Sequence, residues 1–421
     1  MGRVVKKILV LKGLEIKEHK MDILKLVIIF AVIVIVMKMD KPIYIAMLVG
    51  SLATIFLFGI GIGDSLNLVR LGILGRDTIY LVLAFYTITF LQRMLEKREH
   101  LILAEESLTN IFNSRRVNAM IAPFVIGLLP SPGAVLIASP IVDNAAGDYL
   151  KQEEKTFITS FFRHISEAFM PTYAGILLAI NLSGVDMTAF VVAMLPMVLV
   201  LFILGYLFYV RKIPKTQEKI EGIDKANEVK NLIKSLWTIA LTIVIILSLG
   251  IPVHLSVIPV IILSFIINKF TFEEIKPMFI SAFEKKLIFT SVIIMIFKEL
   301  LNHTGVIEQL PYYFNKLPIS AYIVFGLIMF FGTLLAGSQA MVVLLIPLAF
   351  GTITNGGLPL LISLMCMTYI AMQISPTHIC LAIITEHHGT PFASLVRETM
   401  PILILFIIIS SAYSYLLYMV L

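Results

Sequence analysis

The sequence predicts an all-α polytopic membrane protein that consists of two repeats and about ten transmembrane helices. Composition supports the class, because 59% of the residues are hydrophobic, 14% are charged and the mean hydropathy is +0.96. Soluble domains carry about 25% charged residues. Repetition supports the architecture, because apolar segments interrupted by Pro, Gly, Ser and Thr recur in the same order about 205 to 210 residues later. Interrupted segments at matching positions of two halves are typical of secondary transporters.

Three landmarks define the duplication. Met170–Tyr173 (Met-Pro-Thr-Tyr) recurs as Ser375–His378 (Ser-Pro-Thr-His), residues 128–134 recur as residues 334–340, and Pro42 corresponds to Pro252.

Apolar runs long enough to cross a hydrocarbon core of about 30 Å cover most of the chain. They span residues 23–37 (a short run), 42–62, 78–95, 157–181, 187–210, 232–249, 252–267, 287–301, 358–385 and 400–421. Two further stretches, 117–142 and 319–350, are apolar but contain Pro and Gly near their middles. These runs leave no room for a soluble catalytic domain, so we expect no enzyme activity.

The expected divisions follow the duplication. We predict a basic N-terminal tail (1–22), a first membrane repeat (23–210), a cytoplasmic linker (211–231) and a second membrane repeat (232–421). The tail resembles the start of a signal peptide, but no small-x-small cleavage site follows, so residues 23–37 are expected to be a retained helix.

The two interrupted stretches decide the topology. If each dips into the membrane and returns, each half has five crossings plus one re-entrant hairpin, and the repeats are inverted. If each crosses, the repeats are parallel. The inverted arrangement places most Lys and Arg residues of the loops on the cytoplasmic side, as the positive-inside rule requires. It places the basic N-terminal tail outside, which conflicts with that rule unless translation starts at Met21. Pro and Gly fit a re-entrant loop better than a straight helix, so we expect the inverted arrangement.

The turn Pro130–Gly133 followed by Ala134–Asp143 (Ala-Val-Leu-Ile-Ala-Ser-Pro-Ile-Val-Asp), together with the two halves, resembles an uncharacterised prokaryotic membrane family, domain of unknown function 401. That family is grouped with the ion transporter superfamily of gluconate, citrate, dicarboxylate and arsenite carriers. The resemblance implies inverted repeats, a re-entrant hairpin and a broken helix in each half, and elevator-like motion. Better-studied carriers have a Ser-Asn-Thr triplet at each hairpin tip, which this chain lacks.

The two Pro-Thr sites are the first candidate binding positions. Pro171 and Pro376 remove a backbone donor and should leave free carbonyl groups near mid-membrane. Thr172 and Thr377 place hydroxyl groups beside the breaks, with Ser375 just before the second. Such oxygens suit a hard cation, and the helix that restarts after a break directs its positive end at an anion. The alternative is an ordinary kink repaired by neighbouring hydroxyl groups.

The hairpin tips offer a second group of candidates. Their glycines permit tight turns and their polar side chains supply donors and acceptors. The predicted residues are Pro130, Ser131 and Gly133 in the first tip and Gly337, Ser338 and Gln339 in the second.

Ionisable residues inside the membrane are functional candidates by default. Glu167 lies four residues after Arg163 on one helical face, so the two can pair; otherwise Glu167 is the best candidate to carry a coupling proton. His164 is adjacent. His378 and Gln373 occupy the matching region of the second half, where His378 suits proton coupling or donation to an anion.

Other patterns indicate no cofactor. Cys366 and Cys380 are expected to be small buried apolar side chains, and Glu386–His388 to be a solvated loop without a third ligand, so no metal site is predicted. The net charge of +6 follows from topology and needs no nucleic acid. A Gly-rich nucleotide loop is missing from the sequence, which argues against ATP-driven transport.

The sequence therefore favours a multi-pass secondary transporter of the cell membrane, surrounded by lipid, that carries a small solute and is coupled to Na⁺ or H⁺. The resemblance suggests an organic anion as substrate and, because elevator carriers are often dimers, a homodimer as a candidate assembly. The alternatives are an ion channel, which commonly arranges identical loops around an axis, and an intramembrane enzyme, which would require a convergent nucleophile or metal set.

Overall fold

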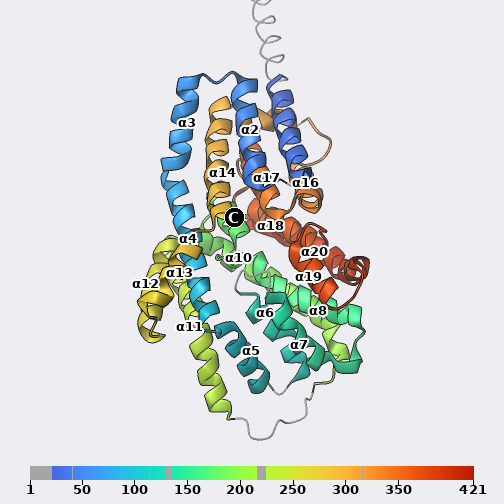
Figure 1. Ribbon diagram of the computed structural model, residues 1–421. Helices are drawn as coiled ribbons and strands as arrows, with labels where there is room; N and C mark the ends of the chain where they lie inside the picture. Colours follow the sequence, from blue (N-terminus) through green and yellow to red (C-terminus); the bar gives the residue numbers. More distant parts are fainter. Residues whose placement is uncertain (1–20, 40, 113, 129–133, 216–223, 315) are drawn as a thin grey trace, which may run out of the picture. The chain divides into compact units, whose positions relative to one another are not determined.

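The computed structural model describes residues 21–39, 41–112, 114–128, 134–215, 224–314 and 316–421, and every secondary-structure element in these ranges is a helix (Figure 1). The described chain divides into two compact units. Unit 1 contains residues up to Val82 together with Lys285–Phe325 and Val343–Asn355. Unit 2 contains Leu83–Glu284, Gly326–Val342 and Gly356–Leu421.

The helices of the first half begin with residues 21–38. They continue with α2 (Ile43–Phe58), α3 (Ile62–Leu74), α4 (Arg76–Lys97), α5 (His100–Ile111), α6 (Arg115–Ile126), α7 (Ala134–Ala146), η1 (Gly147–Tyr149), α8 (Gln152–His164), η2 (Ile165–Ala168), α9 (Ala174–Ser183), α10 (Met187–Phe208) and η3 (Val210–Lys212).

The second half repeats this order. Its helices are α11 (Lys225–Leu249), α12 (Val253–Ile267), α13 (Phe272–Ser281), α14 (Lys285–Thr304), η4 (Ile307–Gln309), α15 (Leu310–Phe314), α16 (Ala321–Ala336), α17 (Ser338–Thr352), α18 (Gly357–Met372), α19 (Ile379–His387) and α20 (Phe392–Val420). Each helix from α2 to α10 has a counterpart ten helices later, so the duplication of sequence landmarks extends to the order of the helices.

Five of the described helices are long and apolar enough to cross a membrane: α4, α10, α11, α14 and α20. Six shorter apolar helices accompany them: α2, α9, α12, α16, α17 and α18. The chain is therefore a helical protein of membrane type. Ten crossings in an inverted arrangement are not established by these lengths and remain a prediction.

Both runs that carry a Pro-Thr pair are broken helices. In the first, α8 ends at His164, the short η2 follows, and regular helix resumes only at Ala174. In the second, α18 ends at Met372 and α19 starts at Ile379. Proline cannot donate to the helix ladder and restricts the residue before it, which explains why helix resumes only beyond Pro171 and Pro376. The predicted breaks are confirmed, and regular α-helix is interrupted from residue 165 to 173 in the first run and from 373 to 378 in the second.

Helices α3 and α13 were not expected from the sequence. α3 and α13 occupy segments that the apolar runs leave as loops, and they begin at Ile62 and Phe272, at matching positions of the two halves. Each is short and polar on one side, so it gives no membrane-spanning signal. The apolar run 42–62 is also divided, because Gly59 ends α2 in a left-handed conformation with φ of 65°.

Within unit 1, α14 packs against α2 and α3. The contact with α3 is tight, because a Cβ atom on Gly72 would lie 2.6 Å from Ile296 Cα. A side chain at position 72 would separate the two helices, so glycine permits this backbone approach.

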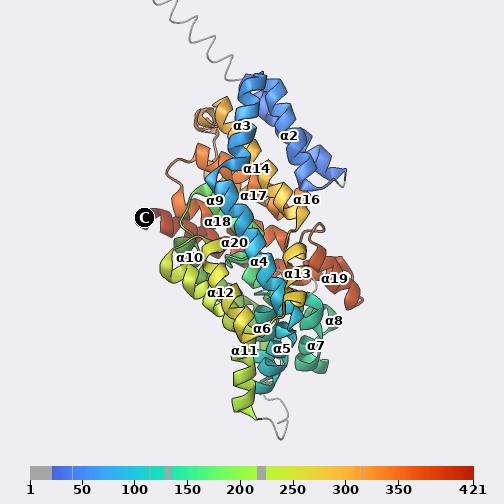
Figure 2. The same ribbon diagram turned by 60° about the vertical axis from the view of Figure 1, so that its left-hand side comes forward.

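Within unit 2, α6 and α7 form a helical hairpin that α5 flanks, as both views show (Figures 1 and 2). Its apolar core consists of Ala122, Ile126, Ala138 and Ile141. Neither helix is long enough to cross a bilayer, which needs about 20 residues. The tip of this hairpin, residues 129–133, lies outside the described residues.

Candidate functional site

The two broken helices meet at a pair of histidines. His164 is the last residue of α8 and His378 precedes α19, and their Nε2 atoms lie 3.0 Å apart. The two rings are nearly perpendicular, with an interplanar angle of 72°. His164 is completely buried. Because one break comes from each half of the chain, this contact joins the duplicated elements within unit 2.

The hydrogen bonds of His164 assign its tautomer. Its Nδ1 lies 2.6 Å from the carbonyl oxygen of Ser160, one turn earlier in α8. A carbonyl oxygen only accepts, so Nδ1 carries the proton and donates it to Ser160. Nε2 of His164 therefore presents a lone pair toward His378, whose Nε2–H donates to it.

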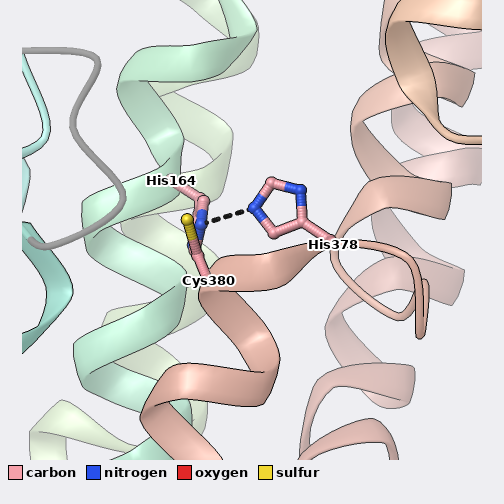
Figure 3. Close-up of side chains that lie close together, drawn as sticks. All are labelled: His164, His378 and Cys380. Atoms are coloured by element: carbon pink, nitrogen blue, oxygen red, sulfur yellow. Dashed lines mark hydrogen bonds between the residues drawn. The ribbon is translucent and has the colours of Figure 1, made fainter. Parts of the chain in front are cut away.

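Cys380 completes a group of three ligand-type side chains. One ring nitrogen of His164, one of His378 and the Sγ atom of Cys380 all lie within 4.8 Å of one another, and the thiol is buried. Figure 3 shows the sulfur beside the ring of His164, with the ring of His378 directed at the same point. Cys380 lies in the first turn of α19, two residues after His378, so the start of that helix positions both.

A buried ion pair lies next to the histidines. Arg163 is 1% exposed and donates from Nη1 to Oε1 of Glu167, which is 11% exposed. The same carboxylate oxygen lies 3.9 Å from Nε2 of His164. The helix α18 packs against η2, which carries Glu167. The pairing predicted from the four-residue spacing is therefore formed, and it places two opposite charges at the first break.

Each break is hydrogen-bonded to the C-terminal end of a preceding helix in its own half. In the first half, Ser166 Oγ and the Tyr173 hydroxyl both donate to the carbonyl oxygen of Gly127, just after α6, each at 2.5 Å. In the second half, Ser375 Oγ donates to the carbonyl oxygens of Thr333 and Leu334 in the last turn of α16, at 3.4 and 3.3 Å. The same kind of contact recurs in both halves.

Two polar atoms of the predicted site are buried without a hydrogen-bond partner among the described residues: Thr172 Oγ1 and Gln373 Nε2. A buried donor or acceptor that stays unpaired costs about 1 to 3 kcal/mol. Such atoms are where an ion, a substrate or water would gain most by binding.

Several predicted residues are thus brought together. Glu167 and His378 lie in the cluster of the two breaks. Ser375 and Thr377 share a hydrogen bond of 2.8 Å, and Thr377 Oγ1 lies 3.7 Å from the position of a Cβ atom on Gly337, where φ is 85°. Pro376 and Thr377 are exposed, while Pro171 is buried.

The remaining predicted residues are less directly placed. Ser338 and Gln339 form the first turn of α17 and are half-buried, so their roles remain predictions. Pro130, Ser131 and Gly133 lie outside the described residues.

Two members of the cluster are not among the binding residues that the sequence predicts. In the sequence, His164 is only the neighbour of Arg163, and Cys380 has the pattern of a small buried apolar side chain. The available signal was the spacing of His378 and Cys380 at one end of a helix that follows a break, but nothing in the sequence indicated that His164 would face them.

One further expectation is wrong. Glu386–His388 is not a solvated loop, because Glu386 and His387 end α19 and the side chain of His388 is 2% exposed. His388 contacts Ser139 and lies 2.9 Å from Thr156 Oγ1 and 3.5 Å from Asp143. Burial lowers the pKa of His388, and the nearby Asp143 carboxylate opposes that effect. The packing of α19 against α7 and α8 explains the burial.

Comparison with known proteins gives a family. No curated protein matches the chain. Residues 23–421 match one family over nearly the whole sequence. The chain therefore belongs to the family described as "Protein of unknown function (DUF401)".

Proposed function

We propose that the protein is a secondary active transporter of a small solute, with an organic anion as the favoured substrate, that works by elevator-type alternating access. The observation that carries the proposal is the meeting of two broken helices, one from each half, in a buried polar cluster. Discontinuous helices at corresponding positions of two repeats are where such carriers bind substrate and coupling ions.

The broken helices support an anionic substrate. Helices α9 and α19 both restart at a break, at Ala174 and Ile379, and a helix N-terminus carries a partial positive charge. The guanidinium of Arg163 adds donors at the same place. Together these groups favour a ligand with negative charge, such as a small carboxylate.

The unpaired groups support coupling to an ion. Thr172 Oγ1 is buried beside the first break and has no hydrogen-bond partner in the described part of the chain. Hydroxyl and carbonyl oxygens are ligands for Na⁺, while the histidines offer groups that could exchange a proton. The proposal therefore includes a gradient of Na⁺ or H⁺ as the energy source.

The arrangement in the membrane is part of the same proposal. It consists of two inverted repeats, each with five crossings and one re-entrant hairpin, in a homodimer in the cell membrane, and it includes a relation to the ion transporter superfamily. The repeated helix order and the short paired helices α6–α7 and α16–α17 support it.

Uptake into proteoliposomes tests the proposal. Vesicles containing the purified protein are preloaded with one unlabelled organic acid and challenged with the labelled acid under an imposed Na⁺ or pH gradient, across a panel of mono-, di- and tricarboxylates. A carrier gives saturable counterflow for at least one acid, increased by one of the gradients. Flux that never saturates and follows the membrane voltage would indicate a channel instead.

Thr172→Ala provides a matched variant. It removes the unpaired hydroxyl, whereas Thr290→Ala removes a hydroxyl that donates to Lys286 within its own helix. Only the first variant should weaken transport.

A further inference from the structure

The group formed by His164, His378 and Cys380 has the composition of a soft-metal site. Its donors are two imidazole nitrogens and one sulfur, all within 4.8 Å of one another. Metal–nitrogen and metal–sulfur bonds of about 2.0–2.3 Å place the donors of a three-coordinate ion about 3.5–3.7 Å apart. The two Nε2 atoms are 3.0 Å apart, so small side-chain shifts would create the required spacing.

The surrounding hydrogen bonds prepare the ligands. Nδ1–H of His164 donates to the carbonyl oxygen of Ser160, which leaves its Nε2 lone pair free to bind a metal. This is the usual support for a metal-bound histidine, because the second nitrogen fixes the tautomer and the ring orientation. The support belongs to α8 itself and does not depend on an ion.

The net charge of the buried cluster favours a monovalent metal ion over a divalent one. The cluster already contains Arg163 and Glu167, whose charges cancel. When a metal binds, the Cys380 thiol loses its proton to solvent, and His378 moves its proton from Nε2 to Nδ1. A monovalent ion then leaves the buried cluster neutral, whereas a divalent ion leaves one uncompensated positive charge, which is costly away from water. Thiolate and imidazole ligands also suit Cu(I).

We propose that His164, His378 and Cys380 bind one Cu(I) ion in a three-coordinate site between the two broken helices. The ion would join α8 to the start of α19 and so link the two halves of the chain. This inference concerns binding alone and does not depend on the transport proposal.

The test uses the full-length protein in detergent under anaerobic, reducing conditions. Cu(I) affinity is measured by competition with a coloured Cu(I) chelator. The two buried cysteines provide the matched pair: Cys380→Ala removes a ligand, and Cys366→Ala removes a buried thiol from α18. Both substitutions replace a small buried side chain by another, so similar folding is expected.

Wild type and Cys366→Ala should bind one Cu(I) per chain. Cys380→Ala and His378→Gln should bind at least about 100-fold more weakly, since loss of a direct ligand exceeds the 10- to 100-fold cost of losing a supporting contact. Equal affinity in Cys380→Ala and wild type would overturn the proposal. So would a site that takes Zn(II) in preference to Cu(I).

A measurement on the wild-type protein tests the site even if the variants fail to fold. X-ray absorption of the Cu(I)-loaded protein should show one sulfur and two nitrogen neighbours. A copper environment without sulfur would refute the assignment.

Discussion

His378 Nε2 lies 3.0 Å from His164 Nε2, although 214 residues separate the two in sequence. Each histidine stands at the edge of a helix break, and the two breaks occupy corresponding positions of a duplicated chain. The contact therefore joins the halves where helical hydrogen bonding is interrupted on both sides. Buried polar side chains accumulate at this point because the interrupted backbone leaves donors and acceptors that must find partners.

Thr172→Ala and Thr377→Ala should each weaken binding of the ion or substrate more than they weaken folding. Loss of a hydroxyl ligand costs about 1 to 3 kcal/mol, or roughly a factor of ten in affinity. The separation should be clearest for Thr172, whose hydroxyl has no hydrogen-bond partner among the described residues. Thermal unfolding measured with and without ligand distinguishes the two effects. Wild-type binding in both variants would leave only a structural role for the kinks.

Glu167→Gln should destabilise the protein, because it leaves the buried guanidinium of Arg163 without its carboxylate. Removing one member of a buried ion pair costs about 3–5 kcal/mol. Arg163→Gln in the same chain should restore much of the loss by removing the unbalanced charge. The yield of folded protein and the unfolding temperature of both single variants and the double variant measure this coupling. If the double variant is as unstable as the two single effects combined, the pair does not act as a unit.

Gly127→Ala should destabilise the first hairpin. A Cβ atom at this position would meet the carbonyl oxygen of Arg163 and lie 2.9 Å from Ser166 Oγ, so the backbones must separate. Overpacking of this kind costs about 1–3 kcal/mol.

Gly175→Ala in α9 is the control for this substitution. Its Cβ atom would meet nothing within 4 Å, and alanine favours the helix by up to about 1 kcal/mol. Thermal unfolding should therefore move in opposite directions for the two variants, and a shift of equal sign and size would contradict the packing described here.

Acid should reduce the stabilisation that the ion pair between Arg98 and Glu274 provides. The two side chains form two hydrogen bonds of 2.8 and 3.0 Å, and Arg98 lies 4.0 Å from the centre of the Phe270 ring. The hydrogen bonds from Arg98, together with one from the backbone N–H of Thr271, lower the pKa of Glu274 from 4.5 to about 2. A lowered carboxyl pKa means that the folded state binds fewer protons, so this stabilisation is complete above pH of about 4.5 and is lost as the pH falls toward 2.

Glu274→Gln measures that contribution. The variant should lack the stabilisation at neutral pH and should lose less stability than wild type between pH of about 4.5 and 2. Glu273→Gln, in the same turn of α13, serves as control. Identical pH profiles for Glu274→Gln and wild type would contradict the role of the pair.

The sequence was most informative where backbone chemistry is local. Proline at positions 171 and 376 predicted both breaks, and the spacing of Arg163 and Glu167 predicted their ion pair, because both follow from the geometry of a single segment. The meeting of His164 with His378 and Cys380 could not be predicted, since it depends on how α8 and α19 pack. Helices α3 and α13 could not be predicted from apolar runs, because a short amphipathic helix lacks the long apolar run that indicates a membrane span.

Alternating access between inverted halves requires the two hairpins to enter the membrane from opposite sides. Asp148 and Asn355 are exposed and can each be replaced by a single cysteine. Asp148 lies in η1, after the first hairpin, and Asn355 follows the second. The two cysteines are introduced separately into a protein that carries Cys366→Ala and Cys380→Ala, and labelled with a membrane-impermeant maleimide in intact and permeabilised cells. We expect position 355 to be labelled in intact cells and position 148 to be labelled only after permeabilisation. Labelling of both positions from the same side would contradict the inverted arrangement.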